Sequence, residues 1–123
     1  MASQPRWDGL IMSSVRVIGG GRAGCSIHNA LVAAGWSSAG VLGREDSWAG
    51  AAHGVDLLVL ATPDEVLAEV AAAVVPVDGT VVAHLSGANG LDVLVDHQAR
   101  GLVHPLVTLP NPEIGAGRLR GAW

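Results

Sequence analysis

A glycine-rich turn constrains the fold of this chain more than any other feature of its sequence. Residues 15–24 read VRVIGGGRAG, in which a short β-branched run is followed at once by Gly19, Gly21 and Gly24 and then by a helical pattern. In a Gly-x-Gly-x-x-Gly turn the first glycine permits the tight exit from the strand, the second leaves room for a pyrophosphate, and the third lets helix and strand pack closely. Because the motif stands between a predicted strand and a predicted helix, it predicts a phosphate-binding turn, with a turn that serves packing alone as the alternative. The predicted contacts are Gly19, Gly21, Arg22, Ala23 and Gly24.

Strand and helix patterns alternate along the rest of the chain. Short apolar runs predict strands at 15–18, 39–43, 55–61, 80–85 and 101–106. Apolar positions at helical spacing predict helices at 22–35, at 62–74 and from 91 until the chain reaches Gly101. A capping box at Thr62 and Glu65, with Pro63 at the first helical position, is expected to begin the second helix.

One connection is too short for the regular pattern. Only eleven residues, 45–55, separate the second predicted strand from the segment DLLVLA (56–61) of the third. A crossover connection needs about ten to twelve residues on its own, so a single helical turn at 48–52 is expected there. The order of elements otherwise predicts an α/β fold of three layers, with a mostly parallel sheet of about five strands between helices and one shortened crossover.

The composition agrees with one buried parallel sheet. At 123 residues the chain has the size of a single domain, expected at 13–123 after a disordered or flexible lead at 1–12. Half of the residues are hydrophobic while Phe and Tyr are absent, so the core must consist of Val, Leu, Ile and Ala. Small branched residues of this kind suit parallel strands that are covered on both faces.

Charge and cysteine content exclude several classes of protein. The net charge of −4 and the absence of Lys argue against nucleic acid or an anionic membrane as a partner. No stretch has the length of a membrane span or the pattern of a secretory signal, so a cytoplasmic location is expected. The single cysteine, Cys25, is expected to be a structural thiol. The spacing of the five histidines predicts no metal site, and His53 and His97 are expected at the surface.

The residues after the second predicted strand indicate which dinucleotide the turn would hold. An acidic residue there would bond the ribose hydroxyls of NAD, whereas an arginine can hold the extra phosphate of NADP. The sequence reads VLGRED at 41–46, which places Arg44 for a charge-assisted contact with that phosphate, and Ser47 could add a hydroxyl. NADP(H) is therefore the preferred cofactor. NAD(H) stays open as the alternative, in which Arg44 is a solvated residue paired with Glu45 or Asp46.

Polar residues follow the later strands at the sheet edge where ligands bind in open α/β folds. The third strand ends at residues expected to border the ribose or nicotinamide, namely Ala61, Thr62 and Pro63. The segment AHLSGANG (83–90) and the later VHP supply groups that could orient and protonate a carbonyl or imine during hydride transfer. The predicted catalytic residues are His84 and Ser86, and the predicted substrate contacts are Ser86, Gly87, Asn89 and His104. The alternatives are that both histidines are core or strand-end residues and that Ser86 and Asn89 only cap the next helix.

Together these motifs resemble those of Rossmann-like oxidoreductases and dehydrogenases that carry a C-terminal half of unknown function, relatives of ketopantoate reductase and pyrroline-carboxylate reductase. The matching pieces are VRVIGGGRAG, DLLVLATPDEVLAEV, TVVAHLSGANGLDVL and LVHPLVTLP, which span most of residues 15–110. HLSGANG and HPL are the more specific of them. The resemblance implies a Rossmann-like fold, an NADP-type cofactor and hydride transfer between NADPH and a small carbonyl or imine substrate.

The chain departs from that family in two respects. It ends at LRGAW, where family members continue into a helical domain that closes the substrate site and often supports a dimer. The expectation is therefore the NADP-binding part alone, incomplete as an enzyme without a second domain, and a homodimer only where such a domain exists. The shortened crossover after Arg44 weakens the adenine side of the pocket. A dinucleotide-binding or redox-sensing module without catalysis, or an inactive gene fragment, stays open as the alternative.

Overall fold

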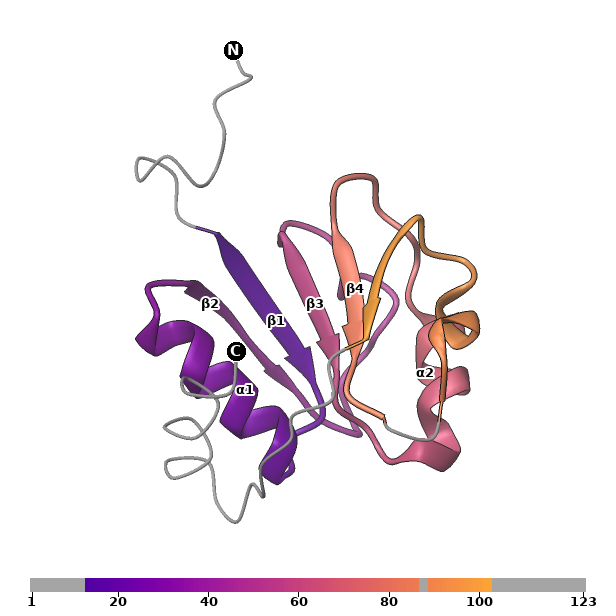
Figure 1. Cartoon of the computed structure of the whole chain (residues 1–123), viewed down its shortest axis with the longest axis horizontal. Coiled ribbons are helices and arrows are strands. Elements are labelled where there is room, and N and C mark those ends of the chain that lie inside the picture. Colours follow the sequence, from indigo (N-terminus) through magenta and orange to yellow (C-terminus); the bar gives the residue numbers. More distant parts are fainter. Residues whose placement is uncertain (1–12, 87–88, 103–123) are drawn as a thin grey trace.

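The strands in the described part of this chain form one parallel sheet (Figure 1). The computed structural model describes residues 13–86 and 89–102. Its elements are, in chain order, β1 (Ser14–Ile18), α1 (Arg22–Ala33), β2 (Ser37–Leu42), β3 (Leu57–Leu60), the 3-10 helix η2 (Asp64–Val66), α2 (Leu67–Ala73), β4 (Val81–His84), the 3-10 helix η3 (Leu91–Leu94) and β5 (Ala99–Leu102). In the described part of the chain, five strands pair in parallel in the order β2-β1-β3-β4-β5. The predicted α/β fold with a parallel sheet is confirmed.

Side chains that alternate along the strands send one apolar layer to each face of the sheet. On β1, Val15 and Val17 pack with α1, whereas Ile18 packs with α2. On β3, Val59 belongs to the α1 side and Leu58 to the α2 side. Because successive strand residues point to opposite faces, a sheet covered on both faces needs apolar residues at nearly every position. The two helices therefore complete the three predicted layers.

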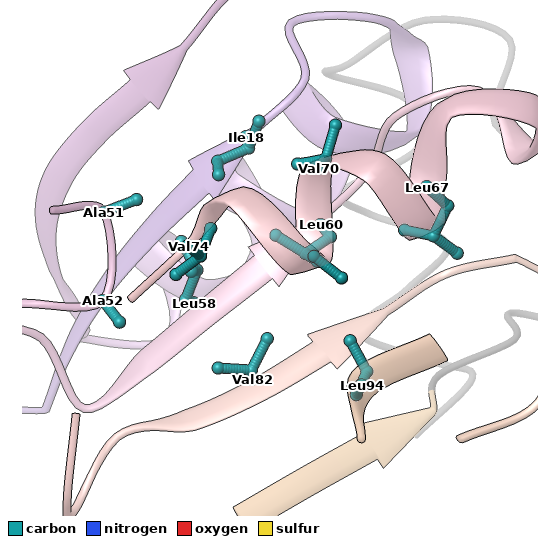
Figure 2. Close-up of a cluster of buried hydrophobic side chains, with 11 residues drawn as sticks. Ile18, Ala51, Ala52, Leu58, Leu60, Leu67, Val70, Val74, Val82 and Leu94 are labelled. Carbon is teal, nitrogen blue, oxygen red and sulfur yellow. The ribbon is translucent and has the colours of Figure 1, made fainter. Parts of the chain in front are cut away.

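The larger core lies between the sheet and α2, as Figure 2 shows. Its buried members are Ile18, Ala51, Ala52, Leu58, Leu60, Leu67, Val70, Ala71, Val74, Val82 and Leu94. Those from α2 and its C-cap recur at spacings of three and four, which is one face of a helix. Full burial of each branched side chain contributes about 1.5–3 kcal/mol, so this face fixes α2 against the strands.

The connection between β2 and β3 contains turns and no helix, which confirms the shortened crossover. The Ala51 N–H donates to the Trp48 carbonyl at 3.0 Å and the His53 N–H to the Gly50 carbonyl at 3.1 Å, so separate hydrogen-bonded turns replace the helical turn that was expected at 48–52. Ala51 and Ala52 are 3 % and 0 % exposed and pack on the α2 face of the sheet. Their small side chains let this loop lie close to the strands, where it covers the area that a crossover helix would otherwise cover.

Side chains from the sheet and from the start of β4 hold this loop in place. The Arg16 guanidinium donates to the Ala51 carbonyl. The Thr80 hydroxyl, on a residue only 5 % exposed, lies 2.9 Å from the carbonyl oxygen of Ala52 and 2.7 Å from that of Val55. A buried carbonyl without a partner costs about 1–3 kcal/mol. These contacts therefore replace hydrogen bonds that a helix would have made within its own backbone.

The capping box predicted at Thr62 and Glu65 is wrong. Pro63 itself occupies the position before η2, with φ −55° and ψ 147°, and no side chain of the described residues caps η2 or α2. This places Thr62 one residue too far from the helical turn to reach its free N–H groups. The α-helix begins only at Leu67 and ends at Ala73, one residue before the predicted end.

The helix predicted after residue 90 is also wrong. Only the four residues of η3 are helical, and β5 begins at Ala99, two residues before the predicted strand. Leu94 is fully buried, and His97, which was expected at the surface, is 3 % exposed with Nε2 3.1 Å from the Ala71 carbonyl oxygen. Both contacts draw the chain toward α2, so little length is left for a helix before β5.

Candidate functional site

The strand order brings the carboxyl ends of β1 and β3 together at the point where the chain changes direction across the sheet. From β1 the chain goes to β2 on one side, and β3 then pairs with β1 on the other side. Ile18 and Leu60 are register partners at these strand ends. In open parallel sheets, ligands bind in the crevice outside such a switch point. The glycine turn follows Ile18 directly, and the segment 61–63 follows Leu60.

Two of the three glycines are required by close approach of the backbone. Gly19 has φ +116°, and a Cβ on it would lie 2.5 Å from the Ala61 carbonyl oxygen. A Cβ on Gly24 would overlap the carbonyl oxygen of Gly19. The turn can therefore run close to the end of β3, and α1 can start close to the end of β1, only with glycine at these two positions.

Gly21 is under no such packing constraint. It precedes α1 with φ −77° and ψ −169°, and a Cβ built on it would meet nothing within 4 Å. In the described part of the chain no side chain caps α1, and its first turn holds no acidic residue. The first N–H groups of a helix have no partner within the helix and carry the positive end of its dipole. The turn thus presents open space and free donors, which is what a phosphate group requires.

A pocket of about 820 Å³ opens at this switch point. Three segments line it: the turn with the start of α1, the loop after β2, and the chain from the end of β3 into α2. Of the predicted cofactor contacts, the lining includes Gly19, Gly21, Arg22, Ala23, Arg44, Ala61, Thr62 and Pro63. The volume lies within the range of about 300–1,000 Å³ that is usual for small-molecule sites.

Arg44 occupies the tip of a tight turn after β2. The Asp46 N–H donates to the Gly43 carbonyl at 3.2 Å, and the Gly43 N–H donates to the Asp46 carboxylate at 2.6 Å. The Asp46 carboxylate is thereby used to close the turn, and Arg44 is exposed at the pocket. Glu45 and Ser47 are exposed and are not among the residues that line the pocket.

Thr62 and its neighbours form the opposite wall. The Ala61 N–H donates to the Ile18 carbonyl at 2.8 Å, which continues the pairing of β1 with β3 up to the pocket. The Thr62 hydroxyl oxygen is buried and has no hydrogen-bond partner among the described residues. Pro63 is exposed at the rim.

His84 is fully buried at the end of β4, and both of its ring nitrogens bond to backbone. The Ser86 N–H donates to Nδ1 at 3.0 Å, so the proton is on Nε2, which donates to the Gly90 carbonyl at 2.9 Å. The Ser86 hydroxyl accepts from the backbone and side-chain amides of Asn89 at 3.2 and 3.0 Å. These residues form a network in the loop after β4, the strand that pairs with β3, and they do not line the pocket.

Two of the predicted site residues, Gly87 and His104, lie outside the described residues. Cys25 is half-buried in the first turn of α1, with its Sγ 3.3 Å from the Gly20 carbonyl oxygen. Within 13–86 and 89–102, no three His, Cys, Asp or Glu side chains are grouped as a metal site.

The pocket also contains residues that the sequence reasoning did not identify. Besides Ile18, Gly20 and Gly43, which adjoin predicted contacts, these are Trp48 from the shortened crossover and Val66, Glu69 and Val70 from η2 and α2. Glu69 and Val70 follow Val66 by three and four residues across the junction of η2 and α2, a spacing that can bring side chains together. The spacing of these residues was the only sequence signal that they could line the pocket. Using that signal would also have required knowing on which side of the sheet the crossover loop lies.

A model of the Rossmann-like domain family matches residues 45–110, which is more than half of the 123 residues. The chain belongs to the Rossmann-like domain family. The matched range of this Rossmann-like domain begins just after Arg44, so it contains Trp48, Thr62 and His84 but not the glycine turn. A comparison with curated proteins found no match. No helix in the described part of this Rossmann-like domain has the length and apolar character needed to cross a membrane.

Proposed function

We propose that this Rossmann-like domain binds NADP(H) and is the cofactor-binding part of an oxidoreductase that acts on a small carbonyl or imine substrate. One observation carries the proposal: a single pocket joins the glycine turn, Arg44 and the end of β3 at the switch point of the sheet. When bound, the nicotinamide would supply or accept the hydride.

The residues around the pocket have distinct proposed roles. The space beside Gly21 and the free N–H groups at the start of α1 would hold the pyrophosphate. Arg44 would bind the phosphate on the adenine ribose. Thr62 and Pro63 would border the nicotinamide end. The loop that His84 holds, with Ser86 and Asn89, would face the substrate, and His104 is proposed to complete that side.

The proposed preference for NADP over NAD rests on the hydrogen bond of Asp46 and on the position of Glu45, the two acidic residues near Arg44. A site selective for NAD needs a carboxylate that accepts hydrogen bonds from the ribose hydroxyls. Here the Asp46 carboxylate accepts from the Gly43 N–H, and Glu45 is not among the lining residues. The presence of Arg44 in the lining, without a free carboxylate from Asp46, therefore supports a preference for the extra phosphate of NADP.

Titration of the full chain with NADPH and NADH tests this function. Arg44→Ala should weaken NADPH about tenfold or more, since a hydrogen bond to a charged group contributes about 1.5–3 kcal/mol, and should leave NADH nearly unchanged. Arg100→Ala is the matched control, because Arg100 is exposed on β5 and does not line the pocket. Failure of the wild type to bind either dinucleotide at millimolar concentration would rule out the proposal, and equal losses for both would remove Arg44 from cofactor selection.

The bonding of His84 favours a second candidate, a dinucleotide-binding module without chemistry of its own. Both nitrogens of His84 bond to backbone, so the side chain positions the loop rather than offering a free proton. The two candidates differ in whether NADPH is consumed. Loss of nicotinamide absorbance with small ketones, aldehydes or cyclic imines supports the oxidoreductase, whereas tight binding without any consumption supports the module.

A further inference from the structure

Part of the pocket wall is apolar and comes from segments that are distant in sequence. Trp48 lies in the shortened crossover, while Val66 and Val70 belong to η2 and α2. The indole Nε1–H of Trp48 donates to the Gly43 carbonyl at 3.1 Å, and the ring packs against the α2-side core. The half-buried ring is thus fixed at one end by a hydrogen bond, and Trp48 is among the residues that line the pocket.

A carboxylate stands beside this apolar wall. Glu69 is exposed in the first turn of α2, and it lines the pocket together with Val66 and Val70. The charged side chains in the lining are otherwise the cations Arg22 and Arg44. The pocket therefore carries positive charge at the turn and at the tip after β2, where phosphates are proposed to bind, and negative charge on α2.

We propose that Trp48 and Val66 hold the adenine ring, with the buried Val70 behind them, and that Glu69 accepts a hydrogen bond from its 6-amino group. This proposal rests on the function proposed above. Flat bases stack on aromatic side chains, and an ionised carboxylate can only accept hydrogen bonds, which matches the amino group of adenine and not the oxo group that replaces it in hypoxanthine. In this proposal the shortened crossover contributes one side chain to the adenine subsite, that of Trp48. The segment from η2 into α2 contributes the others.

The stacking role of Trp48 is tested with 2′,5′-ADP, which carries the adenine, the ribose and the 2′-phosphate but no nicotinamide. Its binding should quench tryptophan fluorescence in the wild type, and Trp48→Phe should abolish the quench. Trp36→Phe is the matched control, because Trp36 packs on the α1 side of the sheet away from the pocket. Quenching that survives in Trp48→Phe and disappears in Trp36→Phe would overturn the assignment.

The role of Glu69 is tested by comparing NADPH with its hypoxanthine analogue, deamino-NADPH. The wild type should bind NADPH about five- to tenfold more tightly, the range expected for one partly solvated hydrogen bond to a charged group. In Glu69→Gln this ratio should fall to within about twofold, since the amide can also donate to the oxo group. Glu65→Gln, on an exposed residue outside the lining, should keep the wild-type ratio.

The outcomes separate this proposal from the one on which it rests. A wild type that binds neither NADPH nor deamino-NADPH overturns the cofactor function and the adenine subsite together. A wild type that binds both equally well keeps the cofactor function and overturns the role of Glu69. Because Glu69 is exposed and Gln has nearly the same shape, loss of folding is not expected, and thermal unfolding of the variant checks this directly.

Discussion

At the residue scale, Gly21 and Gly24 show how one residue type can serve two different purposes in the same turn. Gly24 is needed because α1 starts against the Gly19 carbonyl, so the role of Gly24 is to allow the backbone to pack closely in the folded protein. Gly21 faces open space, so nothing in the described chain prevents a side chain there. The alternatives of phosphate binding and packing alone therefore apply to different glycines, and Gly21 is the one that packing does not explain.

Substitution of these two glycines should separate stability from binding. Gly21→Val should cost about 1 kcal/mol or less, as expected for a poorer residue at the helix N-cap, while filling the space proposed for the pyrophosphate and abolishing NADPH binding. Gly24→Ala should destabilise the fold by about 3 kcal/mol, because the added methyl overlaps backbone. Urea unfolding and NADPH titration of both variants provide the measurements. If Gly21→Val binds NADPH like the wild type, the pyrophosphate does not lie at this turn.

The sequence alone was sufficient to predict the site residues that can be found from their distance in sequence to the end of a strand. The glycines follow a strand directly, and Arg44 follows the next strand at a fixed distance, so each could be found from spacing. Trp48 and Glu69 could not, because they line one pocket only when the crossover loop and α2 lie on the same face of the sheet. His97 was placed wrongly for the same reason: its burial depends on contact with Ala71 in α2, 26 residues away in the chain.

At the element scale, the strands were predictable to within two residues at most ends, whereas the connections were not. A buried parallel strand is a continuous apolar run, and that signal is local. Helix boundaries depended on tertiary contacts instead: Pro63 displaced the predicted cap, and burial of Leu94 and His97 left a 3-10 helix where a longer helix was predicted. The loop after β2 is the clearest case, since side chains on other elements hold it.

Thr80 gives a direct test of that dependence. Thr80→Val removes the hydroxyl that bonds the carbonyls of Ala52 and Val55, and should lower the free energy of unfolding by about 1–3 kcal/mol because buried carbonyls lose their partner. It should also weaken NADPH binding through a less ordered loop around Trp48. Thr80→Ser keeps the hydroxyl and should retain most of the stability in urea unfolding. Equal stability of Thr80→Val and wild type would show that the crossover does not depend on this contact.

At the scale of the whole molecule, the pocket depends on the order of the strands more than on any one motif. Placing β1 between β2 and β3 brings the turn after β1, the tip after β2 and the segment after β3 to one edge. The His84 loop follows β4, the next strand along the same edge, but its residues do not line the pocket. A dinucleotide in the pocket would therefore contact three segments that are far apart in the sequence and would oppose their local opening. It would change the local opening of the β4–β5 region little.

Hydrogen exchange of the full chain with and without saturating NADPH should report this pattern. Amides at 19–25, 43–48 and 61–70 should exchange more slowly with the cofactor, because a ligand that binds only the closed arrangement opposes local opening of every segment it contacts. Amides at 91–97, which pack under α2 and outside the pocket lining, should change little. The Gly21→Val protein under the same conditions is the control and should show no protection. Protection confined to 91–97, with none at the turn, would place the dinucleotide beside the His84 loop and remove it from the switch point.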